Sequence, residues 1–80
     1  MNYFDKEVDA RGLNCPLPIL RAKKALSTME AGQVVRVIAT DPGSVKDFAA
    51  FARQTGNELV EQGQVEGEAD TYEFYLRRKA

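Results

Sequence analysis

Cys15 is the side chain best suited to nucleophilic chemistry, because it is the single cysteine in a chain of 80 residues that has no histidine. One cysteine excludes an internal disulfide and a Cys-x-x-Cys redox pair, and no Cys/His cluster exists to hold zinc. The usual imidazole base of a cysteine nucleophile is also missing. If Cys15 reacts, something other than a side-chain imidazole must activate it.

The residues after Cys15 suggest how the protein could activate this thiol. Pro16 is of the type favoured at the first position of a helix, which predicts that Cys15 is the N-cap. Backbone N–H groups and the helix dipole would then lower the thiol pKa. Pro18 removes another N–H, and we expect both prolines to hold the backbone and affect reactivity rather than the fold. The alternative interpretation is a buried cysteine that acts as a small hydrophobic residue.

Alternating strand and helix patterns surround this motif. Apolar residues recur with a period of two in the predicted strands and at helical spacing in the predicted helices. The expected strands are 3–9, 33–40, 58–66 and 71–78, and the expected helices are 16–29 and 44–55. The order βαβαββ predicts a two-layer α/β sandwich of the α+β type: a four-stranded mixed sheet with both helices on one face. Residues 1–80 would form one domain.

This topology should bring Cys15 next to a second loop. Sites in open α/β sheets lie beyond the carboxyl ends of parallel strands, so the loop from Asp41 to Ser44 should share a rim with Cys15. Ser44 and Asp47 match the spacing of a capping box at the start of the second helix. We expect Gly12 to adopt a positive φ and Leu13 to pack under the helix entrance. The predicted core stripes are Ile19, Ala22, Leu26 and Met29 in the first helix, and Val45, Phe48, Ala49 and Ala52 in the second.

Charge and hydropathy narrow the classes of partner. Eleven basic and twelve acidic residues leave a net charge of −1. This balance lacks the excess of positive charge that is typical of proteins that bind nucleic acid. Residues 1–10 resemble neither a signal peptide nor a transit peptide, and no apolar run approaches the roughly 18 residues of a membrane span. We therefore expect a cytoplasmic protein that binds neither membrane nor nucleic acid directly.

A few side chains are candidate partner contacts, each with a plainer alternative. Arg21, Lys23 and Lys24 are either a solvated helix face or a docking surface for an acidic partner. Arg11 either attracts an anion near the sulfur or is a solvated loop residue. Phe51 lies off the predicted core stripe, so it is either a core-edge residue or an exposed partner contact.

The segment from Asp9 to Pro18, Asp-Ala-Arg-Gly-Leu-Asn-Cys-Pro-Leu-Pro, resembles the signature of the TusA/SirA-like sulfur-carrier family. The Asp-Pro pair at residues 41 and 42 resembles the family's turn before its second helix. The resemblance implies that Cys15 carries sulfur as a persulfide, with Pro16 and Pro18 as its rigid frame. It also implies a structural, scaffold role for the following positions: Asp9, Gly12, Leu13, Asp41 and Pro42.

The resemblance further implies a kind of activity and a kind of partner. Members of this family accept sulfane sulfur from a cysteine desulfurase or a rhodanese-like protein and relay it to an acceptor protein, with no cofactor. Their pathways include tRNA 2-thiolation and molybdenum cofactor maturation. Some members carry a further cysteine in the second helix, where this chain has Ala49, Ala50 and Ala52. That absence favours a sulfurtransferase that acts as a pure carrier rather than as a turnover enzyme on its own.

Two other functions are compatible with the fold. A protein- or RNA-binding regulatory module would leave Cys15 dispensable, although the neutral charge balance and the lack of a stacking aromatic motif argue against RNA. A thiol peroxidase would need a resolving partner or a nearby histidine, and the sequence has neither. Uptake of sulfur by Cys15 would distinguish a sulfur carrier from a binding module and from a peroxidase.

Overall fold

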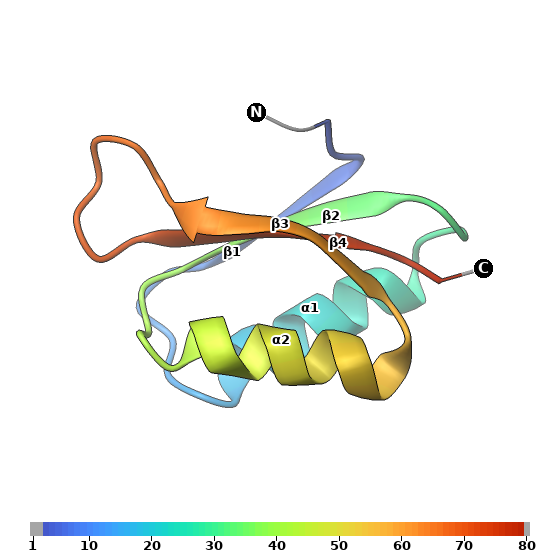
Figure 1. The fold of residues 1–80 in the computed structure, drawn as a ribbon, viewed down its shortest axis with the longest axis horizontal. Coiled ribbons are helices and arrows are strands. Elements are labelled where there is room, and N and C mark those ends of the chain that lie inside the picture. Colours follow the sequence, from blue (N-terminus) through green and yellow to red (C-terminus); the bar gives the residue numbers. More distant parts are fainter. Residues whose placement is uncertain (1–2, 80) are drawn as a thin grey trace.

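The computed structural model of this protein describes residues 3–79. It consists of a four-stranded mixed sheet with both helices packed on one face (Figure 1). The strand order across the sheet is β1-β2-β4-β3. The elements are β1 Lys6–Ala10, α1 Leu17–Ser27, β2 Val34–Ala39, α2 Ser44–Thr55, β3 Glu58–Gln64 and β4 Tyr72–Arg77. This architecture confirms the predicted fold class and the order βαβαββ.

The pairing of the strands follows from how they are connected. The helical crossover leaves β1 parallel to β2, whereas the hairpin makes β3 antiparallel to β4. A second antiparallel pair joins β2 to β4 at the centre of the sheet. The parallel register ends with Ala10 opposite Ala39, so the chain leaves both strands at the same edge. Figure 1 shows that both helices begin at this edge.

The core lies between the sheet and the helices. The side chains of Val35, Val37 and Phe74 are fully buried on the helix-facing side of the sheet, and Phe48 of α2 stacks on Phe74 with ring centroids 4.4 Å apart. Ala22 is fully buried in α1. Such contacts stabilise the fold by the removal of apolar surface from water.

The core stripe of α2 differs from the prediction in two positions. Val45 is 39% exposed, so its assignment to the core is wrong. Phe51 is only 8% exposed and packs edge-on against Phe48, which excludes the interpretation of Phe51 as an exposed partner contact. The buried positions start one residue earlier than expected, at Ser44, and continue at the spacing of about 3.6 residues through Phe48 to Phe51 and Ala52.

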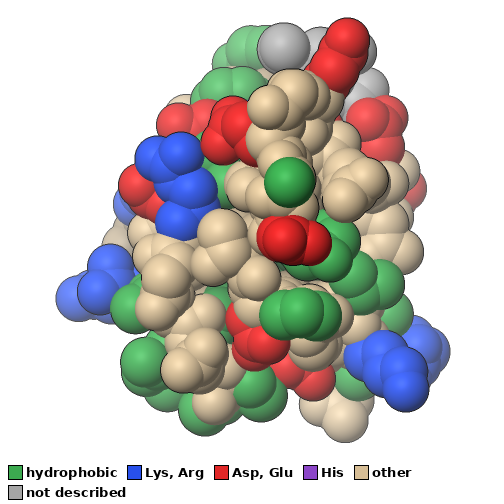
Figure 2. Space-filling view, turned by 90° about the vertical axis from the view of Figure 1, so that its left-hand side faces the viewer, with side chains coloured by type: hydrophobic (Ala, Val, Ile, Leu, Met, Phe, Trp, Pro, Cys, Tyr) green, Lys and Arg blue, Asp and Glu red, His purple; other side chains and the backbone are tan. Residues whose placement is uncertain are grey.

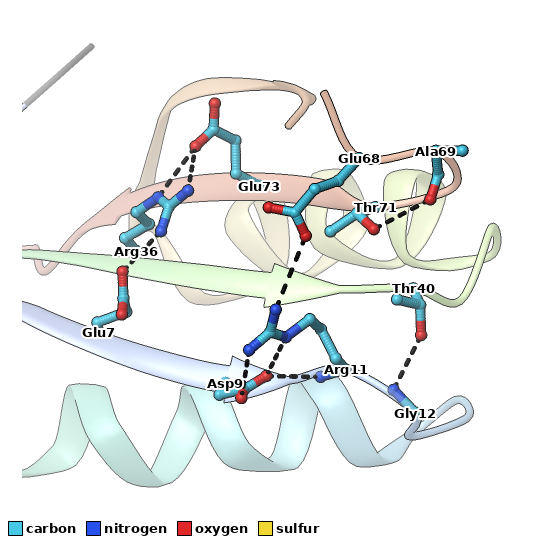
Figure 3. Close-up of polar contacts among 10 residues, drawn as sticks. All are labelled: Glu7, Asp9, Arg11, Gly12, Arg36, Thr40, Glu68, Ala69, Thr71 and Glu73. Atoms are coloured by element: carbon cyan, nitrogen blue, oxygen red, sulfur yellow. Dashed lines mark hydrogen bonds and ion pairs between the residues drawn. The ribbon is translucent and has the colours of Figure 1, made fainter. Parts of the chain in front are cut away.

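An ion-pair network covers part of the open face of the sheet. The guanidinium of Arg36 lies between two carboxylates, 2.6 Å from Glu7 and 2.8 Å from Glu73 (Figure 3). The hydroxyl of Tyr75 donates to Glu73, and the ring of Phe4 packs 6.3 Å from that of Tyr75. These contacts explain why Tyr75 is fully buried on a face that no helix covers.

Some predicted boundaries shift by a few residues. The first strand begins at Lys6 rather than at Tyr3, and α1 begins at Leu17 rather than at Pro16. The strand is shorter because Asp5 pairs with Val34 in an irregular way. The N–H of Asp5 donates to the carbonyl of Val34, but the N–H of Val34 donates to the carboxylate of Asp5 rather than to a backbone carbonyl of the neighbouring strand. Within residues 3–79, neither helix has the length and apolar character that crossing a membrane requires.

Candidate functional site around Cys15

The loops that follow β1 and β2 are joined by hydrogen bonds. The N–H of Gly12 donates to Oγ1 of Thr40 at 2.9 Å (Figure 3), and the N–H of Cys15 donates to Oδ2 of Asp41 at 2.8 Å. Both bonds connect residues more than 25 positions apart in the sequence. The prediction that Cys15 and the Asp41 loop share one rim is therefore confirmed.

Asp41 organises both sides of this rim. While Oδ2 accepts from Cys15, Oδ1 accepts from the N–H of Gly43 at 3.1 Å. The backbone carbonyl of Asp41 also accepts from the N–H of Ser44, the first residue of α2, at 2.9 Å. One carboxylate thus ties the Cys15 loop to the start of the second helix, with the thiol exposed and unpaired with any other cysteine.

The start of α1 differs from the prediction. The N-cap is Pro16 instead of Cys15, and no side chain caps the helix. The N–H of Leu17 donates to the carbonyl of Asn14 at 2.8 Å, so this first-turn donor is already satisfied. The peptide bond between Cys15 and Pro16 is cis. Because Cys15 lies one residue before the cap, the N-cap assignment is wrong, and so is its basis for a lowered thiol pKa.

Two carboxylates contribute to the electrostatic surroundings of the thiol instead. A hydrogen bond to Asp47 raises the pKa of Cys15 above its usual range, with smaller contributions from lost hydration and from the negative charges of Asp47 and Asp41. A methyl group placed on Gly43 would lie 3.6 Å from both oxygens of Asp41 and 3.8 Å from Oδ2 of Asp47. The two acids therefore converge above the same loop. The expected activation of Cys15 by its own helix is replaced by stabilisation of the neutral thiol.

Asp47 is the neighbour of Cys15 that sequence analysis missed. Its spacing from Ser44 indicated a capping box, but the N-cap of α2 is Gly43, and no side chain caps this helix. The N–H of Asp47 instead donates to the carbonyl of Gly43 at 3.1 Å, within the backbone. Its carboxylate raises the pKa of the Cys15 thiol. The sequence did contain one indication of this contact: Asp47 is an acid in the first turn of a helix that was expected to start beside the cysteine loop.

The scaffold residues lie where the motif requires rigidity. Gly12 has a φ of 80°, as expected, and Leu13 is partly buried against the core. Pro18 is fully buried, which contradicts the expectation that it affects reactivity alone. Pro16 and Pro42 are exposed. Pro18 therefore contributes to the core as well as to the helix start.

Arg11 points to acids rather than to the sulfur. Its guanidinium binds Asp9 at 2.9 Å and lies 3.7 Å from Glu68 of the loop between β3 and β4 (Figure 3). Its hydrogen bonds lower the pKa of Asp9 to about 2. The interpretation of Arg11 as an anion-attracting group at the thiol gains no support from these contacts, which join three segments of the chain.

The surface around the site mixes apolar and acidic side chains. Figure 2 looks onto the end at which both helices begin, and acidic and apolar side chains alternate across its middle while Lys and Arg lie toward its sides. Three apolar side chains of the first helical turns are exposed: Leu17 by 45%, Leu20 by 51% and Val45 by 39%. Sequence analysis did not single out Leu17 or Leu20.

The predicted basic contacts lie along α1. Arg21, Lys23 and Lys24 are all exposed. Arg21 and Lys24 also line a shallow groove of about 410 Å³ between α1 and β1, in which Lys6 donates to Oγ1 of Thr28 at 3.0 Å. These positions are open to a partner, and their role stays a prediction.

Comparison with known proteins identifies the class of fold and site. The family model described as sulfurtransferase TusA matches residues 6–78. A sulfur carrier protein TusA from Allochromatium vinosum is 71% identical over 78 residues, which cover 98% of this chain and 99% of the relative. The sulfur carrier protein TusA of Pseudomonas entomophila is 45% identical over 76 residues, with 95% and 91% covered.

A solved structure agrees with these relatives. The crystal structure of a SirA-like protein from Desulfitobacterium hafniense has a TM-score of 0.74 and 30% sequence identity, and the match covers 95% of this chain and all of that one. A small two-layer α/β protein with an exposed cysteine before its first helix is the class that these findings define. The chain belongs to the TusA family.

Proposed function

We propose that this protein carries sulfane sulfur as a persulfide on Cys15 and relays it from a donor protein to an acceptor protein. The observation that carries this proposal is the placement of Cys15: an exposed, free thiol whose loop is tied by Asp41 to the neighbouring loop. Family membership, with the cysteine in the Cys-Pro-x-Pro segment, supports the same role.

The transfer conserves electrons and needs no cofactor. The sulfur of Cys15 attacks the outer sulfur of the donor's persulfide, a new S–S bond forms, and the donor's S–S bond breaks. The donor cysteine leaves as a thiolate and takes up the proton that Cys15 has lost. In the second half of the relay, an acceptor thiolate attacks the outer sulfur on Cys15, which leaves in the same way.

Partners must reach the sulfur and then separate from it. The exposed side chains of Leu17, Leu20 and Val45 offer apolar contact beside the thiol. We propose Lys23, Lys24 and Arg21 as charged contacts at the margin, because charge at an interface mainly raises the rate of association. The proposed donors are a cysteine desulfurase or a rhodanese-like protein, in the cytoplasm, and no direct contact with nucleic acid is required.

The proposed relay ends in another protein rather than within this chain. The second helix has Ala49, Ala50 and Ala52 where a resolving cysteine would stand, so the persulfide leaves only by attack from outside. The acceptors would belong to sulfur-trafficking pathways such as tRNA 2-thiolation or molybdenum cofactor maturation.

Intact-mass measurement tests the proposal. The protein is incubated with a cysteine desulfurase and cysteine, and its mass is measured before and after reductant. We expect one sulfur atom on the wild type, removed by reductant, and none on Cys15→Ser. Because Cys15 is exposed and makes no capping bond, this variant should keep its stability within about 0.5 kcal/mol. A folded wild type that takes up no sulfur from any sulfane donor would falsify the proposal.

A further inference from the structure

The groove between α1 and β1 carries three positive charges. Its basic side chains are Lys6 of β1 and Arg21 and Lys24 of α1, and its volume is about 410 Å³. Nζ of Lys6 donates at 3.0 Å to Oγ1 of Thr28, which is an uncharged acceptor. Within residues 3–79, neither Arg21 nor Lys24 has a carboxylate partner, and Glu30, the first acid after α1, does not line the groove.

The two acids that border the groove are held on the opposite face of the sheet. Side chains alternate between the two faces of a strand, so Glu7 and Asp9 lie on the face opposite that of Lys6. Arg36 binds Glu7 at 2.6 Å, and Arg11 binds Asp9 at 2.9 Å. Figure 3 shows both ion pairs on the side of β1 away from α1. Because each acid is already paired there, the side of the groove that faces α1 keeps its positive charge.

The groove continues the surface beside the thiol. Four positions spaced by four, three and four residues share one face of α1 and its C-cap: Leu17, Arg21, Lys24 and Thr28. The first of them, Leu17, is exposed and lies two residues after Cys15. From Leu17 to Thr28 the helix rises by about 16 Å, a length that about five residues of extended chain span. A partner that contacts Leu17 beside the thiol can therefore extend along the groove.

We propose that this groove binds an extended acidic segment of the protein that donates sulfur to Cys15. The inference rests on the proposed function and names the chemistry of the partner's contact. Carboxylates of the segment pair with Arg21, Lys24 and Lys6, and its backbone lies along β1, an edge strand that pairs only with β2 within residues 3–79. Because alternate side chains of an extended chain point the same way, acids at every second residue face the cations.

Two other occupants fit the groove less well. Nucleic acid carries its phosphates along a longer track, and a chain with a net charge of −1 has no excess of positive charge to follow it. A second copy of this chain that paired antiparallel through β1 about Val8 would place Glu7 of one copy opposite Asp9 of the other. Like charges directly opposite each other destabilise a strand pair. An acidic segment of a different protein meets neither obstacle.

A peptide titration tests the groove without any sulfur chemistry. Amide chemical shifts of the protein are followed as a five-residue peptide of alternating glutamate and valine is added, and the control peptide has glutamine in place of glutamate. We expect shifts within residues 6–8 and 21–28 that weaken as salt rises, and none with the control peptide. An acidic peptide that shifts none of these amides overturns the proposal.

The same measurement distinguishes the other occupants. An oligouridylate that shifts the groove amides more strongly than the acidic peptide does would assign the groove to nucleic acid. Shifts that grow with protein concentration alone would assign it to a second copy of the chain. Either result would overturn the proposal.

Two matched variants test whether the groove serves sulfur transfer. Lys6→Gln with Arg21→Gln removes two charges from the groove, whereas Lys79→Gln with Arg53→Gln removes the same charges outside it. All four side chains are exposed, so both variants should fold. Sulfur uptake is timed with a persulfidated cysteine desulfurase and with a low-molecular-weight persulfide. We expect the groove variant to be about five- to tenfold slower with the protein donor at low salt and unchanged with the small donor.

The control variant should match wild type with both donors. A groove variant that is as fast as wild type with the protein donor would refute the docking role, although sulfur still loads on Cys15. Slowing with the small donor as well would mean that the variant disturbs the thiol, and it would also refute docking. If folded wild type takes up no sulfur from either donor, the carrier function fails, and the peptide titration still decides whether the groove binds an acidic segment.

Discussion

The backbone N–H of Cys15 donates a 2.8 Å hydrogen bond to Oδ2 of Asp41, a residue 26 positions further along the chain. The same carboxylate accepts from Gly43 through Oδ1, so the reactive loop is held by a residue of the neighbouring loop rather than by its own helix. The position of the thiol therefore depends on the parallel pairing of β1 with β2, which brings both loops to one edge.

Replacement of Asp41 by asparagine should loosen this loop. The N–H groups of Cys15 and Gly43 each need an acceptor oxygen, and asparagine offers only one. Its NH₂ group would therefore face one of these two N–H donors. We expect a loss of about 1 kcal/mol in unfolding free energy and faster amide hydrogen exchange at Cys15 and Gly43. Asp70→Asn, in the loop between β3 and β4, is the matched control. Unchanged exchange at Cys15 would mean that the bond to Asp41 does not hold the loop.

Replacement of Pro18 by alanine should destabilise the fold, in contrast to the expectation from sequence. Its ring is fully buried, so the variant leaves a cavity and also gains freedom in the unfolded chain. We expect a loss of about 1–3 kcal/mol, measured by urea unfolding. The same change at the exposed Pro42 should cost well under half as much. If the two variants are equally stable, Pro18 has no packing role.

Charge reversal at Lys23 and Lys24 should slow sulfur transfer from a protein donor. Both lysines are exposed on α1, and opposite charges on two surfaces accelerate their association. For Lys23→Glu with Lys24→Glu, we expect transfer to fall by about tenfold at low salt and to depend less on ionic strength. The control reverses Arg53 and Lys79, which lie near the ends of α2 and β4 away from Cys15. Transfer that is equally fast in all three proteins would remove the lysines from the docking surface.

The titration of Asp9 should report its contact with Arg11. Hydrogen bonds from Arg11 lower the pKa of Asp9 to about 2, and Arg11→Gln should return it toward about 3.9. Because the folded pKa is lowered, the contact stabilises the fold at pH values above the unfolded pKa and loses this effect as the pH falls through about 2. Carboxyl chemical shifts in NMR would follow the titration, with Lys46→Gln as the control. A midpoint that does not move in Arg11→Gln would contradict the pairing.

Local patterns in the sequence determined the secondary structure and its order. Strand and helix periodicities, the glycines at turns and the Cys-Pro-Leu-Pro segment are all features of neighbouring residues, so they predicted βαβαββ and selected Cys15. The parallel pairing of β1 with β2 also followed, because a helical crossover between adjacent strands permits little else. These features need no knowledge of distant contacts.

Only the tertiary structure decided the environment of the thiol. A lowered pKa was predicted from Pro16 alone, whereas the hydrogen bond to Asp47 and the charge of Asp41 raise it. Asp47 resembled a helix cap, and nothing local indicated that its carboxylate would turn toward a cysteine 32 positions earlier. Periodicity likewise could not separate Val45 from Phe51, because their burial depends on how α2 rotates against the sheet. Electrostatic and packing energies depend on through-space distance, and folding sets that distance between residues far apart in the chain.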